Sequence, residues 1–306
     1  MDKEKNFASA VVYCHNDAVT IGKFVESLDH TLNENFLKYE IIIVDDDSHD
    51  DSVQIIRNFA SHKEGKVITV LNMSHYQGLE ASMNAGVDLS IGDFVYEFDY
   101  AVSDFDRSLV MDIYRHSLKG YDIVSARSNR RISFSARIFY AVFNRYANLQ
   151  HKIGSETFRI LSRRAINRVR SITQSVPFRK AAYANCGLTI DCIEYQSDKT
   201  MKRKNPSACR DVTFDSLLLF TDVAYKITMG LAAVMAFIVT VFAFFALFYK
   251  LTRNPVEGWT TTIIFISLGF FGLFIIMAMV IKYLQTLVTL VFHKKTYIFK
   301  SIEKLQ

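Results

Sequence analysis

The stretch that decides the fold is residues 39–51, which read YEIIIVDDDSHDD. Its residues 41–44 are all β-branched and apolar, so a strand formed here has no polar face. Such a strand has to be covered on both faces, as in a parallel sheet with helices on either side. Asp45, Asp46 and Asp47 follow at once, at the edge where open α/β sheets bind their ligands. The stretch therefore predicts an α/β fold with a ligand site at the end of this strand.

Helix capping is the alternative explanation for part of this acidic run. Asp50 or Asp51 is placed to cap a helix over residues 52–59, and a cap needs only one carboxylate. Adjacent carboxylates also repel one another unless a cation or a donor-rich ligand compensates their charge. We therefore expect Asp45 or Asp46 to contact a ligand.

Strands and helices alternate along the first part of the chain. The expected strands are residues 8–14, 41–44, 66–71 and 94–98, and the expected helices are residues 20–32, 52–59 and 80–89. This order predicts a doubly wound, mainly parallel sheet with helices on both faces. Because Asp99 directly follows a strand, it is expected at the same edge as Asp45 and Asp46. The sequence contains neither a GxGxxG turn after the first strand nor a GxxxxGK[ST] loop, which disfavours a dinucleotide site and a P-loop.

Two segments are apolar enough and long enough to cross a bilayer. Residues 227–249 and 260–281 contain 23 and 22 residues, and neither segment contains a charged residue. About 20 apolar residues span a membrane, and a buried core helix of that length would show a polar stripe. The sequence therefore predicts two transmembrane helices within residues 227–283, joined by a short external loop at 250–259.

The distribution of basic residues predicts how these helices are oriented. Basic residues crowd the sides away from the short loop: Lys199, Lys202, Arg203, Lys204 and Arg210 before the first helix, and Lys282, Lys294, Lys295 and Lys300 after the second. By the positive-inside tendency, both ends of the chain are expected to be cytoplasmic, with the protein in the inner cell membrane. Residues 1–6 are polar and do not resemble a secretory signal. The four cysteines lack zinc-site spacing, which fits a reducing compartment.

Seven segments resemble, in order and spacing, the motifs of one enzyme family. They are VVYCHND (11–17), IIIVDDDSHDDS (41–52), GLEASMNAGVDLSIGDFVYEFD (78–99), ARIFYAVFNRYANL (136–149), TFRILSRRAI (157–166), KRKNPSACR (202–210) and KYLQTLVTLVFHKKTYIF (282–299). The chain is similar to the family 2 glycosyltransferases of the GT-A fold, in the branch of the dolichol-phosphate mannose synthases and bactoprenol glucosyltransferases. This resemblance implies transfer of a sugar from a nucleotide-sugar donor to polyprenyl phosphate, for cell-envelope glycan synthesis or modification.

The resemblance also assigns residues to the donor. It implies that Asp17 and Asp46 contact the base and ribose of the nucleotide, and the position of Asp45 at the strand end places it at the same ligand. Asp99 corresponds to the first aspartate of the family's DxD motif, near the metal and the pyrophosphate. Carboxylates commonly hold the divalent cation that binds a nucleotide diphosphate. The resemblance thus implies Mg²⁺ or Mn²⁺ as cofactor, with Asp99 as its ligand and as a catalytic residue.

Basic residues are assigned to the acceptor and to the donor pyrophosphate. Arg127, Arg131 and Arg137 match the family's arginines for the lipid phosphate, and guanidinium groups bind phosphate through paired hydrogen bonds. Lys202 and Arg203 occupy the place of the family's basic loop, which closes over the donor pyrophosphate. The alternative for this basic run is a solvated patch or a surface that faces anionic lipid.

Two positions depart from the family pattern. Ala101 stands where the DxD motif has its second aspartate, so one metal ligand is missing. Thr157 stands where the family has an acidic residue of the acceptor site, and the neighbouring Glu156 is the expected catalytic replacement. A phosphate acceptor is largely ionised at neutral pH and needs no strong base. The leaving nucleotide, in contrast, develops charge that has to be neutralised.

Three functions therefore stay open. The first is an active polyprenyl-phosphate glycosyltransferase. The second, which Ala101 and Thr157 favour, is a catalytically degenerate GT-A-like membrane protein that acts as a binding or assembly partner in a polysaccharide pathway. The third is a glycosyltransferase whose acceptor is a protein or a growing glycan.

The expected domain organisation follows from these segments. Residues 1–207 are expected to form the cytoplasmic GT-A domain, residues 208–226 a membrane-surface amphipathic helix, and residues 284–306 a cytoplasmic amphipathic tail after the two transmembrane helices. The expected partners are the nucleotide-sugar donor, the polyprenyl-phosphate acceptor and the membrane. The resemblance also suggests a homo-oligomer, and no nucleic-acid partner is expected.

Overall fold

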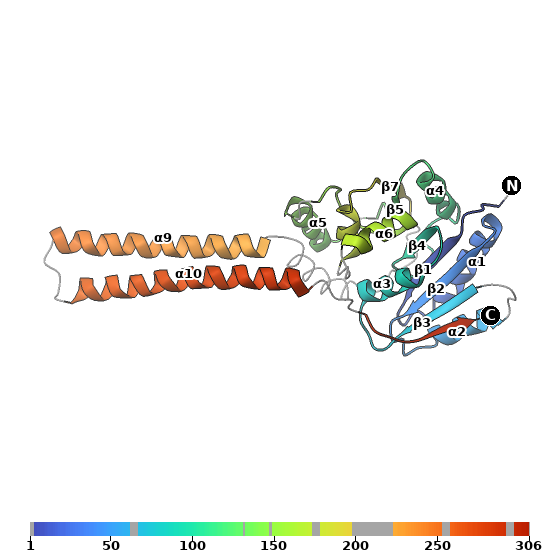
Figure 1. Ribbon diagram of the computed structural model, residues 1–306, viewed down its shortest axis with the longest axis horizontal. Helices are drawn as coiled ribbons and strands as arrows, with labels where there is room; N and C mark the ends of the chain where they lie inside the picture. Colours follow the sequence, from blue (N-terminus) through green and yellow to red (C-terminus); the bar gives the residue numbers. More distant parts are fainter. Residues whose placement is uncertain are drawn as a thin grey trace. The chain divides into compact units, whose positions relative to one another are not determined.

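The structure is a computed structural model that describes residues 3–61, 67–130, 132–146, 149–172, 178–197, 223–252, 258–291 and 297–305. The chain forms two compact units (Figure 1). Met1–Phe214 together with Phe292–Gln306 make up the first unit, and Asp215–Val291 make up the second. Residues 208–222 of the expected surface helix and residues 253–257 of the expected external loop lie outside the described residues.

The first unit is built on an eight-stranded sheet with the strand order β7-β5-β6-β4-β1-β2-β3-β8. Its strands are β1 (Ala8–Cys14), β2 (Tyr39–Asp45), β3 (Val67–Met73), β4 (Phe94–Phe98), β5 (Ile123–Ser128), β6 (Glu156–Ser162), β7 (Ile190–Tyr195) and β8 (Phe299–Leu305). Strands β3, β2, β1 and β4 are parallel neighbours, whereas β6 and β8 run antiparallel to the strands beside them. The predicted, mainly parallel sheet is confirmed.

The apolar run in β2 is buried on both faces of the sheet, as its sequence predicts. Ile41 and Ile43 belong to the hydrophobic core on one face, and Ile42 and Val44 belong to the core on the other. All four side chains are at most 1% exposed. Because β2 pairs in parallel with β1 and β3, this strand lies inside the sheet and fixes the position of the acidic residues that follow it.

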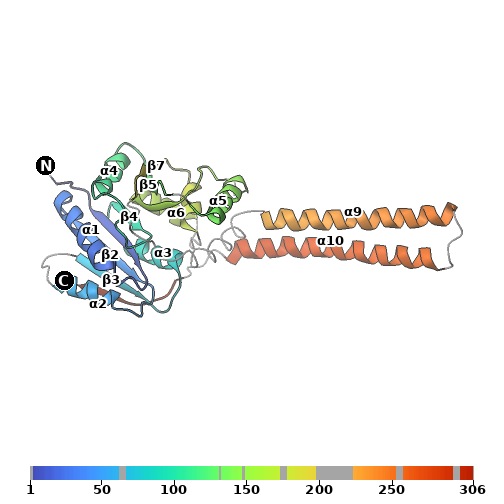
Figure 2. The ribbon, with the colours of Figure 1, turned by 180° about the vertical axis from the view of Figure 1, so that it is seen from behind.

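Helices cover both faces of the sheet (Figures 1 and 2). The helices of the first unit are α1 (Ile21–Asn35), α2 (Ser52–Ser61), α3 (Leu79–Leu89), α4 (Ser108–Ser117), α5 (Phe134–Tyr146), α6 (Arg163–Ile172) and α7 (Arg179–Ala184). Buried residues of α1, α2 and α4 form the first core, and buried residues of α3, α6 and α7 form the second. The sheet is therefore the central layer between two hydrophobic cores, as expected for a doubly wound fold.

The end of the chain differs from the expected amphipathic tail at 284–306. Residues 284–291 belong to helix α10 (Trp259–Val291), and Phe299–Leu305 form β8, which pairs antiparallel with β3 (Figure 1). Without β8, the backbone of β3 would present an unpaired edge. In FKSIEKL, alternate side chains are half-buried, which is the period of a strand and not of a helix.

Side chains attach β8 to the first unit. Arg57 of α2 forms an ion pair with Glu303 at 2.9 Å, and Asn72 of β3 donates a hydrogen bond to the same carboxylate at 2.8 Å. Just before β8, the backbone N–H of Ile298 donates to Gln77 Oε1 at 2.8 Å. The last strand therefore contacts the loop that precedes α3.

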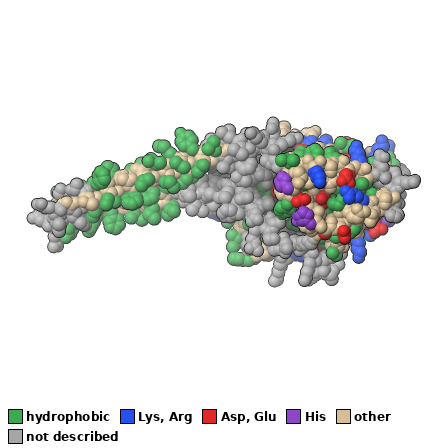
Figure 3. All heavy atoms as spheres, turned by 90° about the horizontal axis from the view of Figure 1, so that it is seen from below, with side chains coloured by type: hydrophobic (Ala, Val, Ile, Leu, Met, Phe, Trp, Pro, Cys, Tyr) green, Lys and Arg blue, Asp and Glu red, His purple; other side chains and the backbone are tan. Residues whose placement is uncertain are grey.

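The second unit is a helical hairpin. Helices α9 (Val223–Thr252) and α10 pack against each other, and they contain apolar stretches at Met229–Tyr249 and Thr262–Leu284 that are long enough to cross a membrane. Few of these side chains are buried within the structure. Hydrophobic side chains cover the visible face of the hairpin (Figure 3). The two apolar helices agree with the predicted hairpin, and they require an apolar surrounding for the side chains that they expose.

Gly86 allows α3 to approach the sheet closely. A β-carbon at this position would lie 2.4 Å from Val11 Cγ1 and 2.6 Å from Val44 Cγ2. We expect Gly86→Ala to lower the free energy of unfolding by about 1 to 3 kcal/mol, because the helix has to move away from a close-packed core. Urea denaturation of the purified protein followed by circular dichroism measures this difference.

Gly22→Ala is the matched control, since it also adds one methyl group to a helix. Its β-carbon would lie 3.0 Å from Ile55 Cγ2, a side-chain atom that can shift. The control should therefore change stability less than Gly86→Ala. Equal stability of the two variants would show that α3 has room to move.

Candidate functional site

The carboxyl ends of β1, β2 and β4 lie side by side at one edge of the sheet. Strand β1 pairs in parallel with both β2 and β4, and Cys14 at its end lies opposite Asp45. Asp46 continues from β2, and Asp99 directly follows β4. The acidic residues that the sequence places at strand ends are therefore at the same edge, as predicted.

Asp46 is a buried residue whose hydrogen bonds connect the loops at this edge. Its Oδ1 accepts a hydrogen bond from the N–H of Gln77 at 2.8 Å, and its Oδ2 accepts from the N–H of Gly78 at 2.8 Å and from the Tyr13 hydroxyl at 2.9 Å. Gly78 has a φ of 85°, which glycine adopts without strain. The Asp46 side chain, which the resemblance places against the nucleotide, is 0% exposed. Its contacts make it a positioning residue for the loops around the edge.

Asp45 and Asp17 lie beside Asp46, and Asp45 is 6% exposed. Asp45 Oδ2 accepts a hydrogen bond from the N–H of Ser48 at 3.4 Å, whereas its buried Oδ1 has no hydrogen-bond donor among the described residues. Burial raises the pKa of the Asp45 carboxyl group. Asp17 is half-buried, and its Oδ2 accepts from the N–H of His15 at 3.1 Å.

A pair of rings lies beside these acids and was missed by the sequence reasoning. The rings of His15 and Tyr76 have centroids 4.8 Å apart and planes inclined at 51°. His15 Nδ1 lies 2.6 Å from the carbonyl oxygen of Asp46, and Tyr76 is 47% exposed. The two residues come from loops far apart in the sequence, so no spacing motif indicates that they meet.

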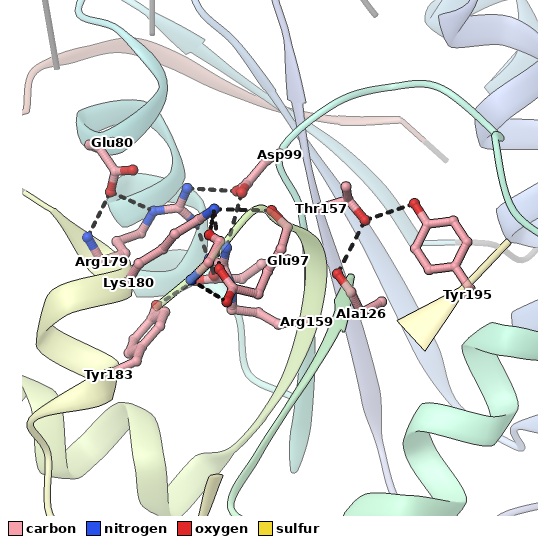
Figure 4. Close-up of polar contacts among 12 residues, drawn as sticks. Glu80, Glu97, Asp99, Ala126, Thr157, Arg159, Arg179, Lys180, Tyr183 and Tyr195 are labelled. Atoms are coloured by element: carbon pink, nitrogen blue, oxygen red, sulfur yellow. Dashed lines mark hydrogen bonds and ion pairs between the residues drawn. The ribbon is translucent and has the colours of Figure 1, made fainter. Parts of the chain in front are cut away.

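Asp99 is enclosed by two buried arginines (Figure 4). Its Oδ2 accepts a hydrogen bond from Arg159 Nη2 at 3.0 Å, and its Oδ1 accepts from Arg179 Nη2 at 2.8 Å. The exposed fractions are 3% for Asp99, 2% for Arg159 and 0% for Arg179. Arg159 lies in β6, next to β4, and Arg179 is the first residue of α7.

Two glutamates complete this group of charges. Glu97 Oε2 accepts from Arg159 Nη1 at 2.7 Å and lies 2.9 Å from Arg179 Nη1, while Glu80 Oε2 accepts from Arg179 Nε at 3.1 Å. The Tyr183 hydroxyl donates to the other oxygen of Glu97 at 2.5 Å. The five charged residues together form the Asp99 cluster: Glu80, Glu97, Asp99, Arg159 and Arg179.

The arginines keep Asp99 ionised. Burial alone would raise the pKa of Asp99, but the charges of Arg159, Arg179 and Lys180 lower it from 3.8 to about 2. Asp99 therefore carries a full negative charge at neutral pH. This charge compensates the buried guanidinium groups, which would otherwise be very costly to bury.

The Asp99 cluster does not fit a divalent cation. Both oxygens of Asp99 already accept hydrogen bonds from guanidinium groups, and the buried Ala101 offers no ligand. Within the described ranges, no group of three or more His, Cys, Asp or Glu side chains has the arrangement of a metal site. Two adjacent guanidinium groups would also repel a cation. The contacts of Asp99 thus disagree with its expected roles as metal ligand and catalytic residue.

Glu156 is held by a second set of cations. Its Oε1 accepts hydrogen bonds from the N–H of Gly154 at 2.7 Å and from Arg127 Nη2 at 3.3 Å, and its Oε2 lies 3.3 Å from Lys180 Nζ. Burial would raise the pKa of Glu156, but the charges of Lys180, Arg159 and Arg127 lower it. A carboxylate with a lowered pKa is a weak base. This geometry does not support the expected catalytic role of Glu156.

Thr157 belongs to a buried group of hydroxyls that ends at the Asp104 carboxyl group. Its hydroxyl donates to the carbonyl oxygen of Ala126 at 3.3 Å and lies 2.9 Å from the Tyr195 hydroxyl (Figure 4). The Tyr195 hydroxyl donates to Asp104 Oδ1 at 3.1 Å. Thr157 therefore takes part in the packing between β5, β6 and β7.

The arginines expected at the acceptor have different surroundings. The side chain of Arg127 is 34% exposed, its Nε is buried, and its guanidinium packs over Gly154, where a β-carbon would lie 2.6 Å from Arg127 Nη2. Arg137 is exposed on α5, with its guanidinium 5.9 Å from the centroid of the Phe134 ring. Three other expected site residues lie outside the described residues: Arg131, Lys202 and Arg203.

Comparison with known proteins decides the family of this chain. The sequence model of the family described as "Glycosyl transferase family 2" matches residues 9–170, which is more than half of the chain. The chain belongs to glycosyl transferase family 2. The match extends from β1 into α6 and contains Asp17, Asp46 and Asp99. It confirms the resemblance and the expected GT-A fold. The two apolar helices expected after this domain are present in the structure.

Curated relatives include glycosyltransferases of several bacteria. The "Uncharacterized glycosyltransferase YkcC" of Bacillus subtilis is 21% identical over 283 residues, which cover 89% of this chain and 86% of the relative. An undecaprenyl-phosphate 4-deoxy-4-formamido-L-arabinose transferase of Aeromonas hydrophila is 26% identical over 138 residues, which cover 45% of this chain and 42% of the relative.

Two solved structures are among those that resemble this chain. The mannosyltransferase PcManGT of Pyrobaculum calidifontis, solved with GDP-Man and Mn²⁺, is 14% identical, with a TM-score of 0.47 over 90% of this chain and 88% of that protein. Glucosyl-3-phosphoglycerate synthase of Mycobacterium tuberculosis, solved with Mn²⁺ and UDP, gives a TM-score of 0.49 at 14% identity, over 70% of this chain and 78% of that protein.

Sequence reasoning also missed the two arginines of the Asp99 cluster. Asp99 is separated by 60 residues from Arg159 and by 80 from Arg179, so no local pattern joins them. One signal was present: Glu97 lies within the apolar strand FVYEF. A carboxylate inside a buried strand requires a buried cation, so Glu97 indicated that an arginine or lysine had to be found elsewhere in the chain.

We predict that acid weakens the first unit through Asp99. Because its pKa is lowered from 3.8 to about 2, the ionised form stabilises the fold above pH 3.8, and this stabilisation is lost as the pH falls toward 2. The loss should amount to about 2 kcal/mol. Denaturation of the purified protein at a series of pH values measures it.

The variant Asp99→Asn removes this pH dependence and leaves the two arginines partly uncompensated. It should lower stability at neutral pH by about 3 to 5 kcal/mol. The control is Asp112→Asn, an exposed carboxylate that faces Arg115 on α4, which should cost at most about 1 kcal/mol. A small effect of Asp99→Asn would contradict the assignment of Asp99 as the counter-ion of these arginines.

Proposed function

We propose that this family 2 glycosyltransferase moves a sugar from a nucleotide-sugar donor to polyprenyl phosphate at the cytoplasmic face of the cell membrane. The observation that carries the proposal is the presence, in one chain, of a family 2 domain and two helices that are apolar enough to cross a bilayer. A transferase anchored in the membrane is concentrated next to lipid acceptors, which favours their reaction. Relatives named as undecaprenyl-phosphate sugar transferases support this choice of acceptor.

The proposed reaction is a single displacement that inverts the anomeric carbon. An oxygen of the lipid phosphate attacks this carbon as its bond to the nucleoside diphosphate breaks, and the diphosphate leaves with the electron pair. A phosphate monoester is largely ionised at neutral pH. The nucleophile therefore does not require proton removal by Glu156 or by a residue at the position of Thr157.

We assign the donor to the edge formed by the ends of β1 and β2. Asp17 and Asp45 are the carboxylates proposed to face the nucleotide, and the partly exposed rings of His15 and Tyr76 supply a surface on which a base can stack. Asp46 positions these groups through its contacts with Gln77 and Gly78 in the loop before α3.

We assign the acceptor phosphate to basic residues near β5 and α5. Arg127 and Arg137 are both accessible to solvent, and Arg131 lies between them in the sequence. Lys202 and Arg203 are proposed to neutralise the leaving diphosphate. Both ends of the chain are placed in the cytoplasm in this proposal, and copies of this chain are proposed to associate as a homo-oligomer.

A second candidate is a protein that binds sugar nucleotides or pathway partners without catalysing transfer. Two observations favour it: Ala101 replaces an acidic ligand, and the Thr157 hydroxyl is engaged in a buried hydrogen-bond chain. A catalytically degenerate protein would keep the fold and the donor edge but show no turnover.

Incubation of membranes that contain the protein tests the proposal. UDP-glucose, GDP-mannose and UDP-N-acetylglucosamine, each labelled in the sugar, are supplied one at a time with polyprenyl phosphate. We expect label in the lipid extract for one donor, and only when polyprenyl phosphate is present. Label in protein or glycan would support a different acceptor, whereas donor binding without transfer would support the second candidate.

Substitution of the two acceptor arginines gives the sharper prediction. Arg127→Ala and Arg137→Ala should each raise the KM for polyprenyl phosphate about tenfold, because each removes a charge-assisted hydrogen bond worth about 1.5 to 3 kcal/mol. The KM for the nucleotide sugar should change little. Arg145→Ala is the matched control, since Arg145 is also exposed on α5 but has no assigned role. A larger increase in the KM for the nucleotide sugar than in the KM for polyprenyl phosphate would show that these arginines belong to the donor site.

A further inference from the structure

The acidic end of β4 already contains its own cations. Each oxygen of Asp99 lies within 3.0 Å of a guanidinium nitrogen, one from Arg159 and one from Arg179. These arginines also pair with Glu97. They therefore bind both Glu97, in β4, and Asp99, which directly follows β4. The pairs are buried, and the contacts of Asp99 with both arginines and of Glu97 with Arg159 are charge-assisted hydrogen bonds.

The charges around Asp99 are balanced without a metal ion. The Asp99 cluster adjoins Glu156, whose carboxylate pairs with Arg127 and Lys180. The positive charge of Lys180 lowers the pKa of both Asp99 and Glu156. Four carboxylates thus face four cations: Glu80, Glu97, Asp99 and Glu156 against Arg127, Arg159, Arg179 and Lys180.

A divalent cation would upset this balance. To coordinate Asp99, it would have to displace Arg159 or Arg179, and the displaced guanidinium would lose its buried partners. The remaining guanidinium would repel the ion at short range. Ala101, which is 2% exposed, contributes no side-chain oxygen to compensate for that loss. Both the geometry and the charge therefore disfavour metal binding at the position where the family implies it.

We propose that Arg159 and Arg179 take the place of the divalent cation at Asp99, so that this chain binds its nucleotide-sugar donor without a metal ion at that position. Asp99 is then a positioning residue, which fixes β6 and α7 against the end of β4. The part of this inference that concerns the donor rests on the proposed function. The part that concerns Asp99 can be tested on the protein without donor.

The first test measures Mn²⁺ binding by the full-length protein in detergent. The melting temperature of the wild type should be the same in millimolar Mn²⁺ and in EDTA, because an ion that binds the folded state would raise it. An increase of several degrees in the wild type that is absent in Asp99→Asn would overturn the proposal. Asp106→Asn is the control for an exposed carboxylate close to Asp99 in sequence, and it should behave like the wild type.

The second test rebuilds a metal site. The double variant Arg179→Leu/Ala101→Asp lacks one of the two guanidinium groups at Asp99 and gains a carboxylate at position 101. Its buried carboxylates should then be able to bind a cation. We expect this variant to melt at a lower temperature than the wild type in EDTA and to be stabilised by Mn²⁺, with Mn²⁺ binding visible by electron paramagnetic resonance. If the variant does not fold, the comparison of wild type with Asp99→Asn still decides the assignment.

The third test measures donor affinity by calorimetry, with UDP-glucose and GDP-mannose as probes. For the donor that binds, Kd should differ by no more than about twofold between EDTA and Mn²⁺. A loss of more than about tenfold in EDTA would overturn the metal-independent part of the inference. If neither probe binds in either buffer, the proposed function fails for these donors, while the Mn²⁺ melting experiment still decides the role of Asp99.

Discussion

Charge compensation beside β4 is the constraint on which the first unit depends. This strand carries Glu97 and Asp99 into an interior where an unpaired carboxylate is very costly. Arg159 supplies one cation and therefore fixes β6 next to β4, although β6 runs in the opposite direction. Arg179 supplies the other and fixes the start of α7 against the same residues. The ion pairs thus join β6 and α7 to the end of β4.

A second buried acid organises the neighbouring strand ends. Asp46 joins the end of β1 to the loop before α3 through Tyr13, Gln77 and Gly78. The carboxylates of Asp46 and Asp99 therefore both accept hydrogen bonds from other groups of the chain. The proposed donor edge consists of Asp17, Asp45 and the rings of His15 and Tyr76, which lie beside these buried contacts.

The return of the chain from the helical hairpin adds a further connection. Strand β8 covers the edge of β3, and Ile298 contacts Gln77, whose N–H binds Asp46. The residues after the second apolar helix thus reach the loop that shapes the proposed donor edge. The short strand β8 thereby takes the place of β3 at this edge of the sheet.

The sequence by itself determined the layers of the fold and the two apolar helices. The apolar run Ile41 to Val44 and the helical period of α1 predict which side chains are buried, because each pattern can be recognised from residues close together in the sequence. The strand β8 and the ion pairs of Asp99 depend on partners far along the chain, so local pattern did not reveal them. Only the tertiary structure decided which side chains compensate the buried acids. It did so because burying a carboxylate requires a partner, and the fold brought Arg159 and Arg179 to Asp99.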